Sequence, residues 1–178
     1  MAVSRSLSGA SGSDQFERVI RTPIMELPGE SRYVTVAGVR THYIVAGDGE
    51  PLLLFHGLGA SVATWRDNIG PLSKVFRVYG IDLPGHGNSD KPDMNYSADT
   101  LAQFALRLID TLGLDRPSII GNSVGGALGL MLALGHPERV SGLVLVDSAS
   151  LGREISMYLR LVSDPGLGEL LGISRVGG

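Results

Sequence analysis

The chain has 178 residues, of which 43% are hydrophobic and 19% are charged, and its formal net charge is −3. This size and composition predict one soluble globular domain with a substantial core, and the weak charge favours neither nucleic acid nor an anionic membrane surface as a partner. There is no cysteine, so disulfides and thiolate metal sites are excluded. No apolar run reaches the roughly 18 residues of a membrane span. We therefore expect a cytoplasmic protein, of undetermined oligomeric state.

The amino-terminal segment has the composition of a tail. Residues 1–13 are rich in Ser, Gly and Ala and contain no apolar core of a signal peptide. We expect residues 1–30 to be disordered or extended, and residues 31–150 to form the folded core.

Apolar runs and glycines then alternate in a way that predicts strands and helices in turn. A hairpin is expected around Ala37-Gly38, and Pro51–Phe55 is a continuous apolar run, typical of a strand covered on both faces. The other expected elements are a helix over 62–73, strand 76–81, an amphipathic helix from Ser97 to Gly113, strand 117–120, a helix over 127–134 and strand 143–146. This order predicts an α/β fold with a mostly parallel sheet and helices on both faces.

The segment Gly121-Asn122-Ser123-Val124-Gly125 lies between an expected strand and an expected helix. Such a turn is sharp, and residues without a Cβ permit it. The turn exposes Ser123 at the carboxyl edge of the sheet, above the positive end of a helix, and both features suit a nucleophile whose attack generates an oxyanion.

Three ordered motifs resemble those of the α/β-hydrolase superfamily. They are the oxyanion loop His56-Gly57-Leu58-Gly59, the loop Asp82 to Asp90 and the nucleophile elbow at Ser123. The resemblance implies that the third strand lies beside the fifth. It also implies that Ser123 is the nucleophile, that the backbone amides of Leu58 and Val124 bind the oxyanion, and that no metal or organic cofactor takes part.

Other polar residues at this edge of the sheet receive supporting roles. We interpret His56, Gly57, Asp82 and His86 as residues that order their loops, with the alternative that His56 or His86 replaces the catalytic base. Asp147 follows the last expected strand, where some relatives place the catalytic acid; the alternative is a capping or turn aspartate. His42, in the hairpin, is expected to be remote from the elbow and to have little functional importance.

A catalytic base is missing from its expected place. The family's base is a histidine near the carboxyl end, but the one histidine after Ser123 is His136. It lies 13 positions further along a helix, about 20 Å away at 1.5 Å per residue. Residues 151–178 resemble the opening helices of a lid. We therefore expect a fold that is incomplete at its C-terminal end, and a fragment with little or no activity.

The sequence thus predicts a serine hydrolase acting on an ester or a related small acyl substrate. A carbon–carbon bond hydrolase and an acyltransferase are alternatives within the enzymes. From another class, the alternative is a non-catalytic remnant or binding module.

Overall fold

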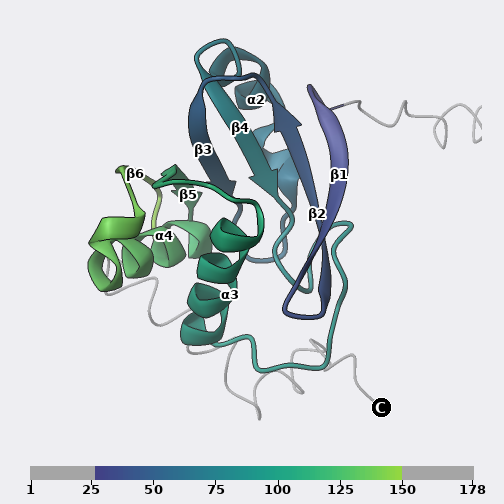
Figure 1. The fold of residues 1–178 in the computed structure, drawn as a ribbon. Helices are drawn as coiled ribbons and strands as arrows, with labels where there is room; N and C mark the ends of the chain where they lie inside the picture. Colours follow the sequence, from purple (N-terminus) through teal and green to yellow (C-terminus); the bar gives the residue numbers. More distant parts are fainter. Residues whose placement is uncertain (1–26, 150–178) are drawn as a thin grey trace, which may run out of the picture.

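The computed structural model describes residues 27–149, which form one six-stranded sheet with helices against it (Figure 1). The strand order is β1-β2-β4-β3-β5-β6. The strands are β1 (Glu30–Val36), β2 (Val39–Ala46), β3 (Glu50–Phe55), β4 (Phe76–Ile81), β5 (Ser118–Asn122) and β6 (Gly142–Val146).

Strand pairing is antiparallel on one side of the sheet and parallel on the other. β1 pairs with β2, and β2 with β4, in antiparallel register. β3 pairs in parallel with β4 and β5, and β5 with β6. The prediction that the third strand lies beside the fifth is therefore confirmed. Parallel pairing also brings the carboxyl ends of β3, β4, β5 and β6 to one edge, which carries the predicted site.

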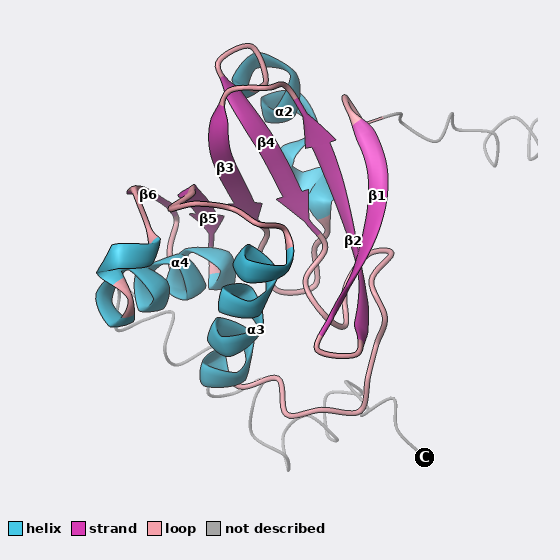
Figure 2. Cartoon of the chain, in the orientation of Figure 1, coloured by secondary structure: helices cyan, strands magenta, loops and turns pink. Residues whose placement is uncertain are grey.

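The helices cover both faces of the sheet (Figure 2). α3 (Ala98–Thr111) and α4 (Val124–Gly135) pack on one face, whereas the short 3-10 helix η1 (Val62–Trp65) and α2 (Arg66–Leu72) pack on the other. Side chains of β3 alternate between the two cores: Leu53 and Phe55 face α3 and α4, and Leu52 and Leu54 face α2. The prediction that this strand is buried on both faces is confirmed.

Two helices differ from their predicted bounds. The helix expected over 62–73 is divided into η1 and α2, and Pro71 stands in the last turn of α2. The helix expected to begin at Ala127 begins at Val124, directly after Ser123. Glycines at 125 and 126 lower helix propensity and masked this start, but Gly125 is buried against β3, where a side chain would not fit.

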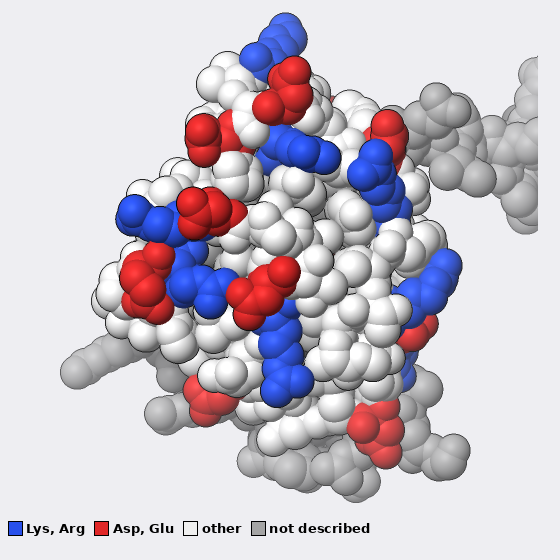
Figure 3. All heavy atoms as spheres, viewed as in Figure 1, with Lys and Arg blue, Asp and Glu red and all other residues white. Residues whose placement is uncertain are grey.

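The surface has mixed charge, and the helices are short. Basic and acidic side chains are interspersed over the face seen in Figure 3, so no patch of one sign forms there. Within residues 27–149 no helix is both long and apolar enough to cross a bilayer. The expected tail over 1–26 and the expected lid over 151–178 lie outside the described residues.

Candidate active site

Ser123 occupies a strained turn between β5 and α4. Its φ of 51° and ψ of −114° are unusual for a residue with a side chain and cost of order 1–3 kcal/mol. Backbone hydrogen bonds hold this conformation. The Ser123 amide donates to the Val146 carbonyl at 3.0 Å, and the Ser123 carbonyl accepts from the amides of Gly126 at 3.0 Å and Ala127 at 3.1 Å. The strain is therefore supported by β6 on one side and by the first turn of α4 on the other.

Glycines at two positions make this turn sterically possible. A Cβ at Gly121 would overlap the carbonyl of Gly125, and a Cβ at Gly125 would overlap the carbonyl of Phe55, the last residue of β3. The strand, the turn and the helix thus approach one another at backbone distance. This approach explains the glycines on either side of Ser123 by packing.

The loop after β3 lies directly against Ser123. A Cβ added to Gly57 would come within 3.2 Å of the Ser123 Cβ and 3.1 Å of Asn122 Oδ1. Leu58, the next residue, is 54% exposed. On the other side of the serine, Val124 is the first residue of α4, so its amide has no carbonyl one turn earlier to bond. The backbone at Gly57 and the first amide of α4 therefore approach Ser123 from two elements.

His56 ties the loop after β3 to the loop after β4. Its ring is fully buried, its Nδ1 lies 2.7 Å from the Gly57 carbonyl, and its Nε2 accepts a 3.1 Å hydrogen bond from the Leu83 amide. A carbonyl can only accept, so Nδ1 carries the proton and the ring is neutral. Burial lowers the pKa of His56, which favours this neutral form. Both nitrogens face backbone groups, which leaves neither to accept a proton from Ser123.

Asp82 is the centre of a larger buried network. Its Oδ1 accepts from the Val62 amide at 2.7 Å, and its Oδ2 accepts from the Asn88 amide at 2.9 Å and from His42 Nδ1 at 2.7 Å. Its carboxylate also fills the space beside Gly87, where a Cβ would overlap it. The carboxylate therefore joins β2, the start of η1 and the loop after β4.

His42 is the residue whose importance the sequence reasoning missed. The sequence reasoning expected it to be remote from the elbow and of little functional importance, and did not foresee that its ring is 2% exposed and bonded to Asp82. Its backbone amide also donates to Ser89 Oγ at 2.8 Å, and that hydroxyl donates to the Asp82 carbonyl at 2.6 Å. One signal was available: His42 shares a strand face with apolar Ile44, and a buried imidazole needs a partner.

The remaining predicted residues lie around this framework. Asp147 directly follows β6, where Val146 pairs with Asn122, so its backbone adjoins the elbow; its φ is 47° and its side chain is exposed. His86 Nδ1 lies 2.9 Å from the Pro84 carbonyl, and its ring centroid is 5.1 Å from that of His56. His136 follows the 12-residue helix α4 and lies 13 positions after Ser123, about 20 Å away at 1.5 Å per residue.

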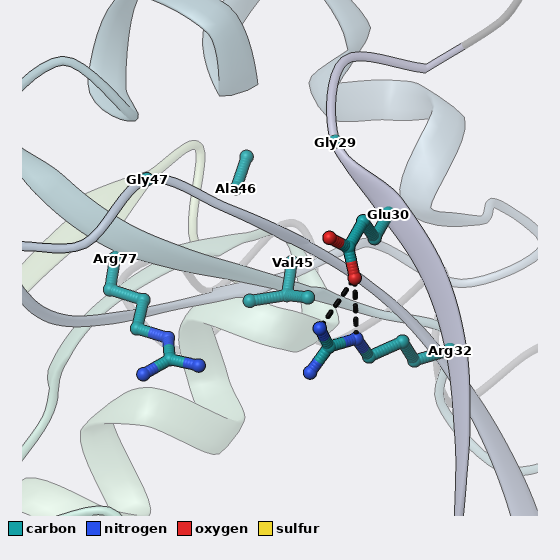
Figure 4. A pocket seen from close by; sticks show the side chains of 7 residues that line it. All are labelled: Gly29, Glu30, Arg32, Val45, Ala46, Gly47 and Arg77. Carbon is teal, nitrogen blue, oxygen red and sulfur yellow. Dashed lines mark hydrogen bonds and ion pairs between the residues drawn. The ribbon is translucent and has the colours of Figure 1, made fainter.

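One surface cavity lies at the opposite edge of the sheet, near the amino ends of β3 and β4. It measures about 350 Å³ and is lined by Gly29, Glu30, Arg32, Val45, Ala46, Gly47 and Arg77. Figure 4 shows the ion pair of Glu30 with Arg32, and Arg77 on the other side of Val45. The cavity contains none of the predicted site residues. Within residues 27–149 no group of three or more His, Asp or Glu side chains could hold a metal ion.

The strand order and the strained serine turn are those of an α/β hydrolase. The sequence profile described as the alpha/beta hydrolase fold matches residues 50–165, so the chain belongs to this family.

Relatives with stated activities support this assignment. The chain is 41% identical over 133 residues to a 2-hydroxy-6-oxo-6-(2'-aminophenyl)hexa-2,4-dienoic acid hydrolase of Metapseudomonas resinovorans, covering 72% of this chain and 46% of that protein. Among solved structures it is similar to a meta-cleavage product hydrolase from Pseudomonas fluorescens, with 37% identity, a TM-score of 0.63 and coverage of 66% and 44%. A serine hydrolase involved in carbazole degradation gives 40% identity, a TM-score of 0.67 and coverage of 70% and 50%. The chain thus spans about half the length of these relatives.

Proposed function

We propose that this chain is the nucleophile-bearing part of a serine hydrolase that cleaves small acyl compounds, such as esters, through an acyl-enzyme on Ser123. The observation that carries the proposal is the strained elbow, which holds Ser123 at the sheet edge against the backbone of Gly57 and at the start of α4. The amides of Leu58 and Val124 supply the oxyanion hole. Removing one such donor typically costs a hundred- to a thousandfold in turnover.

The proposed reaction has one demanding step within this chain. Ser123 Oγ attacks the acyl carbon, and the carbonyl oxygen becomes an oxyanion that preorganised amides stabilise better than reorienting water. The hydroxyl must lose its proton in that step. His56 and His42 are both held by other partners, and His136 is far along α4. Asp147, beside the elbow, is the proposed acid that would orient a base.

The same geometry suits a second reaction. The relatives named above include hydrolases of a 6-oxo dienoic acid and of a meta-cleavage product. We propose, as the alternative substrate class, carbonyl compounds whose carbon–carbon bond next to the carbonyl is hydrolysed. The elbow and the oxyanion amides would serve either substrate, because both reactions develop negative charge on a carbonyl oxygen.

Turnover by the 178-residue chain tests this proposal. We expect slow hydrolysis of an aryl ester, well below about 1 s⁻¹, the lower end of typical enzyme turnover, because the amides can act without a base while the serine stays protonated. The multiple-turnover rate should fall to background in Ser123→Ala. A 6-oxo dienoic acid assayed in parallel distinguishes the two substrate classes.

Two results would contradict the proposal. An unchanged hydrolysis rate in Ser123→Ala would show that Ser123 is not the nucleophile. Turnover in the range of ordinary serine esterases, lost in Ser123→Ala, would show that a base within this chain does reach the serine, and His86→Asn would then test the nearest alternative.

A further inference from the structure

A second Ser-His-Asp arrangement lies away from the elbow, on the hairpin of β1 and β2. Ser31 Oγ is 2.9 Å from His42 Nε2, and His42 Nδ1 is 2.7 Å from Asp82 Oδ2. A hydroxyl beside a base that a third group orients is the general geometry of an activated nucleophile. The three residues are called the Ser31 relay below.

The neighbours of Asp82 fix the protons in the Ser31 relay. The backbone amides of Val62 and Asn88 donate to the two carboxylate oxygens, so Asp82 acts as an acceptor toward its neighbours. The proton between Asp82 and His42 therefore sits on Nδ1. When the ring carries no second proton, Nε2 has a free lone pair to which the Ser31 hydroxyl can donate. This is the direction of proton transfer that a general base requires.

In the Ser31 relay the base and the acid are buried, whereas the serine is exposed. His42 is 2% and Asp82 is 1% exposed, so the base and the residue that orients it are rigidly held. Ser31 is exposed on β1, the outermost strand on its side of the sheet, where a small molecule can reach it.

A cation lies on the same face of the hairpin. The Tyr33 ring packs on the His42 ring with centroids 5.1 Å apart, and the Arg40 guanidinium lies 3.5 Å from the Tyr33 centroid. Tyr33 therefore packs against His42, and Arg40 packs against Tyr33, which helps to fix the imidazole on this face.

We propose that Ser31 is a second reactive hydroxyl, which accepts an acyl group from an activated ester independently of Ser123. The Ser31 Oγ–H proton passes to His42 Nε2 while Oγ forms a bond to the acyl carbon. The bond from that carbon to the aryl oxygen breaks, and the leaving phenolate takes the electron pair. It then takes up the proton from His42, so the products are acyl-Ser31 and a free phenol.

Paired cysteine variants test the base directly. The chain has no cysteine, so Ser31→Cys and Ser141→Cys each carry a single thiol. Ser141 is also exposed, but its hydroxyl contacts the Ser118 hydroxyl at 2.9 Å and no histidine. We expect Ser31→Cys to react with iodoacetamide at neutral pH at least about tenfold faster than Ser141→Cys, because an adjacent imidazole promotes the thiolate. Equal rates would overturn the proposal.

Acyl transfer itself is tested with p-nitrophenyl acetate on the Ser123→Ala variant, which removes the elbow as a competing site. Peptide mass spectrometry should find an acetyl group on Ser31 well above the level on Ser141. Ser31 acetylated no more than Ser141, in protein whose circular dichroism spectrum is native, would also overturn the proposal. Neither experiment depends on the function proposed for Ser123.

Discussion

At the scale of single residues, His56 couples the charge state of one ring to the position of the oxyanion loop. The neutral ring donates to Gly57 and accepts from Leu83, and burial lowers its pKa below the ordinary value of 6.5. Protonation would turn the accepting Nε2 into a donor facing the Leu83 amide, so the loop contact would be lost. The structure therefore links loop geometry to pH.

The sign of this link gives a prediction. Below pH 6.5 the unfolded chain binds a proton at His56 more readily than the folded chain does. The free energy of unfolding should therefore decrease as the pH is lowered, by at most about 1.4 kcal/mol per pH unit from this residue. Above pH 6.5 this contribution is fully present. Urea unfolding at pH 7.5 and 5.5 should show that the free energy of unfolding decreases less between these pH values in His56→Gln than in the wild type. His136→Gln, which alters an exposed ring, is the control. Its free energy of unfolding should decrease between the two pH values by as much as that of the wild type. Equal losses in wild type and His56→Gln would contradict this assignment.

At the scale of elements, the loop after β4 depends on the contact between Gly87 and Asp82. Gly87 has a φ of 49°, and a Cβ there would overlap the Asp82 carboxylate. Gly38, in the β1–β2 turn, also has a positive φ, of 86°, but a Cβ there would meet open space. Because both substitutions carry the backbone penalty of roughly 1–2 kcal/mol, their difference isolates the contact.

We therefore expect Gly87→Ala to lower the free energy of unfolding by about 1–3 kcal/mol more than Gly38→Ala, the ordinary penalty of disturbing a buried polar group. Chemical denaturation of the two variants in parallel measures this difference. Similar destabilisation by both substitutions would mean that the loop moves away from Asp82 at little cost.

Elements with local sequence signals were predicted, whereas contacts between residues far apart in the sequence were not. Strands β3, β4 and β5 and the turn at Ser123 carry local signals, namely apolar runs that end in glycines, and these were predicted. The pairing of His42 with Asp82 was not, because it joins residues 40 positions apart and depends on β2 lying beside β4. The early start of α4 was missed for a related reason, since the close approach to β3, and not local propensity, explains Gly125.

At the scale of the whole molecule, the parallel part of the sheet gathers the strand ends and their loops at one edge. The carboxyl ends of four parallel strands meet at one edge, and the loops after β3 and β4 are joined there by the buried bonds of His56 and Asp82. The chain spans about half the length of its relatives, and β6 is the outermost strand on the parallel side of the sheet among the described residues. The elbow is held by β5, β6 and α4 and packs against β3, all within the described residues, so its reactivity can be measured in this chain.

The most direct measurement is the site of reaction with a fluorophosphonate, a strong electrophile that traps nucleophilic serines. The chain would be incubated with the reagent, digested and analysed by peptide mass spectrometry, with Ser123→Ala as the matched variant. We expect an adduct on the peptide that contains Ser123, absent from that peptide in Ser123→Ala, whether or not Ser31 also reacts. A folded chain in which Ser123 stays unmodified while other exposed serines react would contradict it.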